Sequence, residues 1–297
     1  MSNEGYLITA DGARLFYNVK GIGSQVVIVP NAIYMEQDVA WLSDTHKVVF
    51  YDLRNRGRSA TLTDRSQLER GIHHDVDDLE TIRRQLRFER VHVLGHSYLG
   101  LVVALYAMRF PQHVDRVVQI GPAQADMSKQ YPPTLAHDDG VLGEVFTALG
   151  QLQAQRQGSD PVSFCKAAWS LLRRMYVTDA VNADKLAHWG FCELENERNM
   201  LTHFNVNILP SLKALKISDA DYAKVTSPVL TIHGTKDRNA PYGGGRDWAT
   251  SLPNARLLTV RDAAHAPWVE EPALLVESIH AFLAGNWPTA TENLKLR

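Results

Sequence analysis

Hydrophobic residues along this chain form short continuous runs that alternate with segments of helical spacing. The runs are rich in Val and too short for typical helices, so they predict strands buried on both faces. These strands are expected at 26–30, 47–52, 91–97, 114–121, 227–234 and 255–260. Between them, residues 73–90 place Val76, Leu79 and Ile82 at helical spacing, and a second apolar helix is expected at 98–110. The alternation predicts an α/β fold with a mostly parallel central sheet flanked by helices.

Two segments depart from this alternation. Residues 6–20 alternate apolar and polar positions around Asp11-Gly12, a turn pair that predicts an antiparallel hairpin at the sheet edge. Residues 124–224 show helical spacing without a convincing buried strand, which predicts a helical cap inserted between two core strands. We therefore expect an α/β core of residues 1–123 and 225–285, a helical cap of residues 124–224 and a loosely held C-terminal tail of residues 286–297.

Composition narrows the class of partner. The 297 residues carry 31 Lys and Arg against 33 Asp and Glu, a net charge of −2 that gives no reason to expect nucleic acid or an anionic membrane. No apolar stretch approaches a membrane span and the N-terminus does not resemble a signal peptide, so the expectation is a cytoplasmic protein with a small-molecule substrate. Cys165 and Cys192 lie outside any C-x-x-C pair and are expected as free buried thiols, with no metal site. The oligomeric state is not indicated.

Three residues follow predicted buried strands at positions suited to catalysis. Ser97 stands where the strand at 91–97 turns at once into a helix, Asp237 follows the strand at 227–234, and His265 follows the strand at 255–260. Taken singly, they have ordinary explanations as a helix-capping serine, a turn residue and a packed core histidine. Taken together, the order Ser, Asp, His at the carboxyl ends of parallel strands predicts nucleophilic catalysis.

From about Tyr6 to Leu283 the chain resembles the α/β-hydrolase superfamily. The resemblance rests on YDLRNRGRS at 51–59, GHSYLG at 95–100, HGTKDRNAP at 233–241 and DAAHAPWVEEP at 262–272. It implies that Ser97 is the nucleophile, His265 the general base and Asp237 the acid that orients the base. The resemblance also implies an oxyanion hole made by two backbone N–H groups and no requirement for a cofactor; the donors fall on Ala32 and Tyr98.

The motifs differ from the usual family pattern at two places. Leu99 stands where most relatives have the second glycine of G-x-S-x-G, so we expect a small local shift or smaller neighbours around it. Pro30-Asn31 replaces the usual His-Gly, which leaves the Ala32 N–H available and adds Asn31 as a candidate substrate contact through its side-chain amide.

The segment FCELENERN and the residues before it add Glu193, Glu195 and Trp189 as further substrate-binding candidates. A glutamate gripping a substrate ammonium beside an apolar wall would resemble the prolyl-aminopeptidase branch, whereas the ordinary interpretation is a solvated helix face. Tyr98 replaces the Trp that usually follows the nucleophile in that branch. The sequence therefore favours a serine carboxylesterase for small or medium acyl groups, with an aminopeptidase, a non-hydrolytic ligand receptor or a lyase as alternatives.

Overall fold

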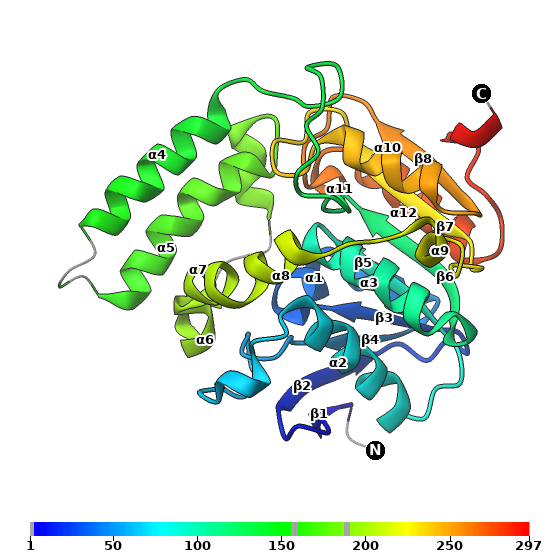
Figure 1. Cartoon of the computed structure of the whole chain (residues 1–297), viewed down its shortest axis with the longest axis horizontal. Helices are drawn as coiled ribbons and strands as arrows, with labels where there is room; N and C mark the ends of the chain where they lie inside the picture. Colours follow the sequence, from blue (N-terminus) through cyan, green and yellow to red (C-terminus); the bar gives the residue numbers. More distant parts are fainter. Residues whose placement is uncertain (1–2, 156–157, 159, 187–190, 297) are drawn as a thin grey trace.

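The computed structural model describes residues 3–155, 158, 160–186 and 191–296. A nine-stranded sheet with the order β1-β2-β4-β3-β5-β6-β7-β8-β9 forms the centre of the molecule (Figure 1). Strands β3 to β8 run parallel, while β1, β2 and β9 pair antiparallel at the edges. The strands are β1 (Glu4–Ile8), β2 (Arg14–Lys20), β3 (Val26–Pro30), β4 (Lys47–Tyr51), β5 (Val91–His96), β6 (Val114–Ile120), β7 (Val229–Gly234), β8 (Ala255–Val260) and β9 (Thr291–Glu292). The predicted mostly parallel α/β sheet and its edge hairpin are confirmed.

Helices cover both faces of the sheet because successive strand residues point to opposite sides. Val27 and Val29 of β3 pack in one apolar cluster, whereas Ile28 between them packs in the other. The first cluster takes in α1 and α12, and the second takes in α2, α3 and α10. The helices of the core are α1 (Ala32–Asp38), α2 (Ile72–Gln85), α3 (Tyr98–Arg109), α10 (Tyr242–Ser251), α11 (Pro267–Glu270) and α12 (Pro272–Leu283).

Between β6 and β7, the regular elements that the structure describes are all helical. They are α4 (Val141–Ala154), α5 (Pro161–Leu172), α6 (Glu195–Arg198), α7 (Met200–His203), α8 (Leu209–Ala214) and α9 (Asp219–Tyr222), with short 3-10 turns and one π-helical turn between them. Figure 1 shows α4 and α5 side by side and projecting beyond the sheet, whereas α6, α7 and α8 lie nearer to it. These helices lie within residues 124–224, where the sequence predicts a helical cap. This segment is called the helical interval below.

The C-terminal segment is attached to the sheet. Thr291 and Glu292 of β9 pair with Leu258 and Leu257 of β8. This pairing differs from the expectation of a loosely held tail at 286–297. The sequence could not reveal it, because a two-residue edge strand carries no alternating pattern long enough to recognise.

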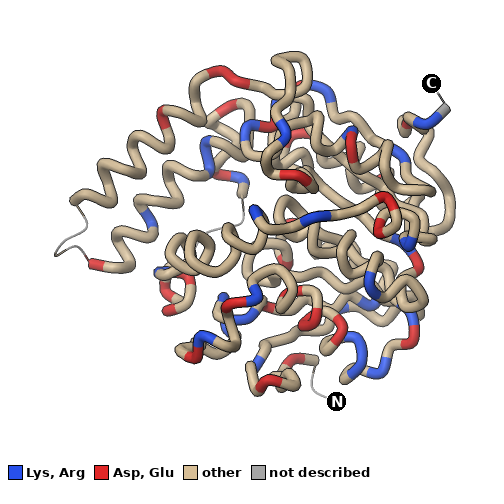
Figure 2. Tube along the Cα trace, in the orientation of Figure 1, with Lys and Arg blue, Asp and Glu red and all other residues tan. Residues whose placement is uncertain are grey.

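Charges of both signs are interspersed along the chain, without a single-sign stripe (Figure 2). None of the helices among the described residues is both long and apolar enough to cross a membrane. The described residues also contain no cluster of His, Cys, Asp and Glu suited to a metal ion.

The two cysteines form a disulfide, so the prediction of free thiols is wrong. Cys165 of α5 and Cys192 of the 3-10 turn Phe191–Glu193 are 27 residues apart in sequence, with their Cα atoms 5.7 Å apart. Sequence spacing gave no signal because the path of the helical interval alone brings them together. Disulfides persist mainly in oxidising compartments, so the bond gives no support to a cytoplasmic location.

Removing this disulfide is expected to destabilise the fold. Opening a loop of this length in the unfolded chain should lower the free energy of unfolding by about 3 to 4 kcal/mol. Urea denaturation of the double variant Cys165→Ser/Cys192→Ser should show this loss, and a reducing agent should lower the stability of the wild type but not of the variant. Equal stability of the wild type with and without reductant would contradict the prediction.

Candidate active site

Ser97 lies at the sharp turn between β5 and α3. Its backbone has φ 56° and ψ −124°, a conformation that costs a non-glycine residue about 1 to 3 kcal/mol and is retained mainly at functional sites. The turn is fixed by the Ser97 N–H, which donates to the Ile120 carbonyl at 2.9 Å, and by the Ser97 carbonyl, which accepts from the N–H groups of Gly100 and Ala123. The Ser97 side chain makes no capping hydrogen bond, so helix capping does not account for this serine.

The leucine at position 99 is compatible with this turn because two neighbouring glycines provide the close approaches. A Cβ atom on Gly95 would lie 2.1 Å from the Leu99 carbonyl oxygen, so the strand residue must be glycine. A Cβ atom on Gly100 would lie 3.0 Å from the Cβ atom of Pro122, which leaves little space for a side chain there. The Leu99 side chain itself is 4% exposed and packs in the apolar cluster beneath α3. The unusual G-x-S-x-L-G spacing therefore places its second glycine one residue later.

His265 and Asp237 form a buried pair at the same edge of the sheet. Asp237 follows β7 and His265 follows β8, and the His265 Nδ1 lies 2.7 Å from the Asp237 Oδ2. The other carboxylate oxygen of Asp237 accepts the backbone N–H groups of Asn239 and Ala240, each at 2.8 Å. Burial alone would raise the pKa of Asp237, but His265 and the nearby His233 hold it below its ordinary value.

The ionised carboxylate determines the tautomer of His265. Because the carboxylate only accepts hydrogen bonds, the proton of the neutral imidazole lies on Nδ1 and Nε2 is left as a base. A Cβ atom on Gly121, whose φ is +48°, would lie 3.1 Å from the Asp237 Oδ2 and 3.2 Å from the His265 Nδ1. A side chain at position 121 would therefore disturb the pair.

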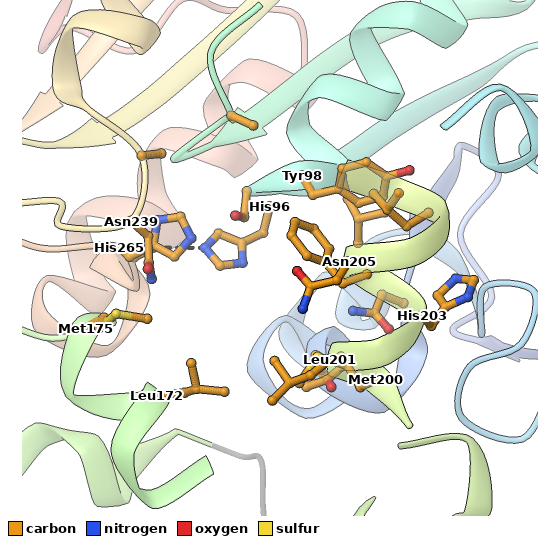
Figure 3. Close-up of a pocket in the computed structure, with 18 of the residues that line it drawn as sticks. His96, Tyr98, Leu172, Met175, Met200, Leu201, His203, Asn205, Asn239 and His265 are labelled. Carbon is orange, nitrogen blue, oxygen red and sulfur yellow. Dashed lines mark hydrogen bonds between the residues drawn. The ribbon is translucent and has the colours of Figure 1, made fainter. Parts of the chain in front are cut away.

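Two further histidines, which the sequence reasoning missed, hold this pair in place. The His233 Nε2 lies 3.2 Å from the Asp237 Oδ2 and 3.0 Å from the Ala240 carbonyl oxygen, so its N–H is shared between them. The His96 Nε2 lies 2.9 Å from the carbonyl oxygen of His265, and the two rings are in contact, with centroids 4.4 Å apart (Figure 3). In the sequence, only their positions could have indicated these two histidines: His233 precedes a glycine at the end of β7, and His96 directly precedes Ser97.

The two predicted oxyanion donors begin helices. Ala32 is the first residue of α1 and Tyr98 the first residue of α3, where backbone N–H groups have no partner within the helix. Within the described part of the chain neither N–H donates a hydrogen bond. Asn31, the residue before α1, has a left-handed backbone with φ 68°, and its buried Oδ1 has no partner among the described residues.

Ser97, His265 and Asn31 line a single cavity of about 830 Å³ beneath the helical interval. Figure 3 shows His265, Asn239 and Met175 on one side of it and Tyr98 and His203 on the other. Most of its wall is apolar, with residues contributed by the helices between β6 and β7, including Phe146, Leu149, Phe164, Trp169, Leu172, Met175, Leu201 and Phe204. The cavity can hold a small apolar molecule against the serine hydroxyl.

A family profile described as the alpha/beta hydrolase fold matches residues 33–272. The chain belongs to the α/β-hydrolase fold family. Among its relatives is a putative carbamate hydrolase, RutD, of Agrobacterium fabrum, which is 27% identical over 263 residues and covers 85% of this chain and 88% of the relative. The bifunctional esterase/perhydrolase DCH of Acinetobacter calcoaceticus is 25% identical, covering 94% and 99%.

Solved structures of α/β hydrolases share this fold. The esterase RhEst1 from Rhodococcus superposes with a TM-score of 0.71 at 18% identity, covering 95% of this chain and 99% of the esterase. A meta-cleavage product hydrolase from Pseudomonas fluorescens gives a TM-score of 0.71 at 19% identity, covering 95% and 98%. At this level of identity the likeness shows the α/β-hydrolase fold alone.

Two residues of this α/β hydrolase that were predicted to contact substrate do not line the cavity. Glu193 is exposed and pairs with Lys166 at 2.8 Å, and Glu195 is exposed at the start of α6. Neither residue lines the cavity, so the structure does not bring them together with Ser97 and His265, and their contact with substrate stays a prediction. The physical reason for their exposure is that solvation of charged side chains favours the outer face of this turn. Trp189, the third candidate in this segment, lies outside the described residues.

The neighbouring Glu197 is the carboxylate that turns inward. It accepts hydrogen bonds from Arg56, from the Tyr34 hydroxyl at 2.7 Å and from the Gly57 backbone N–H at 2.8 Å. Burial by itself would raise the pKa of Glu197, but Arg56 and the other donors bring it below its ordinary value. Because α6 lies between β6 and β7 and Arg56 follows β4, this buried ion pair fastens the helical interval to the core.

Proposed function

We propose that this α/β hydrolase is a serine carboxylesterase that cleaves small or medium acyl esters through an acyl-enzyme on Ser97. The observation that carries the proposal is the strained backbone of Ser97, whose hydroxyl is not used as a helix cap and which shares a cavity wall with His265. Such strain persists where the exposed hydroxyl has a chemical role.

In the proposed mechanism His265 Nε2 accepts the proton of the Ser97 hydroxyl while the serine oxygen attacks the ester carbonyl. The N–H groups of Ala32 and Tyr98 stabilise the negative oxygen that develops, since neither donates to another group among the described residues. Asp237 holds the imidazole in the required tautomer and stabilises its protonated form. His265 then protonates the leaving alcohol, and a water activated by the same imidazole hydrolyses the acyl-enzyme.

The ester as substrate is supported by the cavity and by the relatives. An apolar wall around about 830 Å³ suits an alkyl or aryl acyl group, and the relatives include proteins named as esterases. The relatives named as putative carbamate hydrolases extend the same acyl chemistry to a carbonyl flanked by nitrogen. Glu193 and Glu195 are exposed and do not line the cavity, so they give no support to an aminopeptidase.

The test is a rapid-mixing experiment with p-nitrophenyl butyrate at neutral pH. We expect a burst of p-nitrophenol close to one equivalent per chain if deacylation is slower than acylation, and acid quenching during turnover should trap one butyryl group on the peptide that contains Ser97. The variant Ser97→Ala, checked for folding by circular dichroism, should give neither.

Turnover of the ester at equal rates in the two proteins would contradict the acyl-enzyme on Ser97. Absence of turnover in both proteins would contradict the ester as substrate. Aryl carbamates and aminoacyl amides assayed in parallel would then identify the bond cleaved, and binding without turnover of any of them would favour a receptor or lyase.

A further inference from the structure

Asp75 is a buried carboxyl group in the cavity that the proposed mechanism does not use. It lies on the inner face of α2, is 2% exposed and lines the same cavity as Ser97. Its Oδ2 accepts a hydrogen bond of 2.6 Å from the hydroxyl of Tyr98, the residue that follows the nucleophile. Asp75 is thus connected by one side chain to the site of acyl transfer.

The second oxygen of Asp75 has no hydrogen-bond partner among the described residues. The nearby arginines are engaged elsewhere: Arg54 binds Asp78 through two hydrogen bonds of 2.7 and 2.6 Å, and Arg56 binds Glu197. Asp75 is therefore a cavity carboxyl without a bonded cation. A buried carboxyl in this state has an unused capacity to accept a hydrogen bond or to bind a positive charge.

The surroundings of Asp75 raise its pKa towards neutrality. Burial and the nearby Asp78 raise the pKa, the Tyr98 hydroxyl, Arg54 and Arg56 lower it, and the net result is a pKa of about 7. A substrate cation placed against this carboxyl would favour the ionised form. The cavity is otherwise mostly apolar, so such a contact would distinguish substrates by a polar group remote from the ester.

We propose that Asp75 is a specificity-determining residue that binds an N–H donor, best a primary ammonium group, carried by the substrate in either its acyl or its alcohol part. The inference rests on the proposed esterase function and specifies its substrate class as esters with an amino group several carbons from the carbonyl. Tyr98 positions the carboxyl through its hydroxyl and contributes its backbone N–H to the oxyanion hole.

The test compares kcat/KM for matched esters that differ only in the terminal amine. The acyl pairs are p-nitrophenyl 6-aminohexanoate with hexanoate and 8-aminooctanoate with octanoate, and the alcohol pair is 6-aminohexyl butyrate with hexyl butyrate. In the wild type at pH 8 we expect the amino ester of at least one pair to be preferred, and Asp75→Asn to lower that preference by about tenfold or more, because hydrogen bonds to charged groups are the strong ones.

A control variant and a pH series test whether the Asp75 carboxylate is the group that produces the amine preference. Asp77→Asn removes a carboxylate from the same helix outside the cavity, where Asp77 pairs with Arg70 and Arg109, and should leave the ratio at the wild-type value. Between pH 6 and pH 8 the ionised fraction of Asp75 rises through its pKa of about 7, so the wild-type preference should rise up to about tenfold. The amine stays protonated over this range.

The inference is overturned if the wild type prefers no amino ester over its apolar partner, or if Asp75→Asn keeps the wild-type ratio. If Asp75→Asn does not fold, Tyr98→Phe serves instead: it removes the hydroxyl that positions the Asp75 carboxyl and lowers its pKa, so the amine preference at pH 8 should fall, and an unchanged ratio would contradict the proposal. Hydrolysis of apolar esters that depends on Ser97, without any amine preference, would refute the inference and leave the esterase intact. Failure to hydrolyse any ester would refute the proposed function itself.

Discussion

His265→Gln should lower kcat for p-nitrophenyl butyrate by a factor on the order of 10⁴ to 10⁶, because members of a catalytic triad act as a unit. The glutamine can still fill space beside Asp237, but it cannot accept the serine proton. The Asp237 carboxylate, which accepts from His265 Nδ1 at 2.7 Å, would keep its two backbone donors, so the fold should persist. Steady-state kinetics with thermal unfolding of both proteins would measure the effect.

A histidine outside the cavity provides the matched control. His113 is half-buried in the 3-10 turn Pro111–His113 that follows α3 and does not line the cavity, so His113→Gln should retain wild-type kcat. A folded His265→Gln protein that retained more than about one hundredth of wild-type kcat would contradict the role of general base, since general acid–base catalysis alone contributes about 10²- to 10⁴-fold.

Glu197→Gln should lower the free energy of unfolding by about 3 to 5 kcal/mol, because removing one member of a buried ion pair leaves the other charge without compensation. The Glu197 side chain is fully buried and the Arg56 side chain is 11% exposed, so water cannot replace the lost carboxylate. The substitution also weakens the bonds from Tyr34 and from the Gly57 N–H. Urea denaturation followed by circular dichroism would measure the loss at pH 7.

Glu195→Gln is the matched control, because Glu195 lies two residues earlier on the same short helix and is exposed. It should change stability by no more than about 0.5 kcal/mol. The double variant Arg56→Met/Glu197→Gln should recover part of the loss, since it removes the unpaired cation. Equal stability of Glu197→Gln and Glu195→Gln would contradict the assigned role of the ion pair.

The stability that Glu197 contributes should depend on pH with a definite sign. Its pKa in the folded state lies below the ordinary value of 4.5, so its contribution is fully present above that value and is lost as the pH falls through the folded pKa. The difference between the wild type and Glu197→Gln should therefore be constant near neutrality and shrink below pH 4.5. An unchanged difference in acid would show that the carboxylate charge is not what stabilises the contact.

The buried strands and the helices between β6 and β7 show why the sequence predicted some features and not others. The buried strands could be predicted from Val-rich runs, because burial on both faces of the sheet excludes polar residues. In contrast, Glu193, Glu195 and Glu197 look alike in sequence, and only the path of α6 decides that Glu197 turns inward to meet Arg56. The pairing of Cys165 with Cys192 depended on the same path.

The sequence by itself determined the parallel α/β sheet and placed Ser97, Asp237 and His265 at its edge, because strand burial and strand-end position are local and periodic properties. The tertiary structure alone decided the partners of groups distant in the chain. It gave Asp75 its place in the cavity and Glu197 its ion pair, and it turned Glu193 to solvent. Such contacts join segments that lie far apart in the sequence at no regular spacing. A local or periodic pattern therefore cannot predict them, and they form only when the chain has folded.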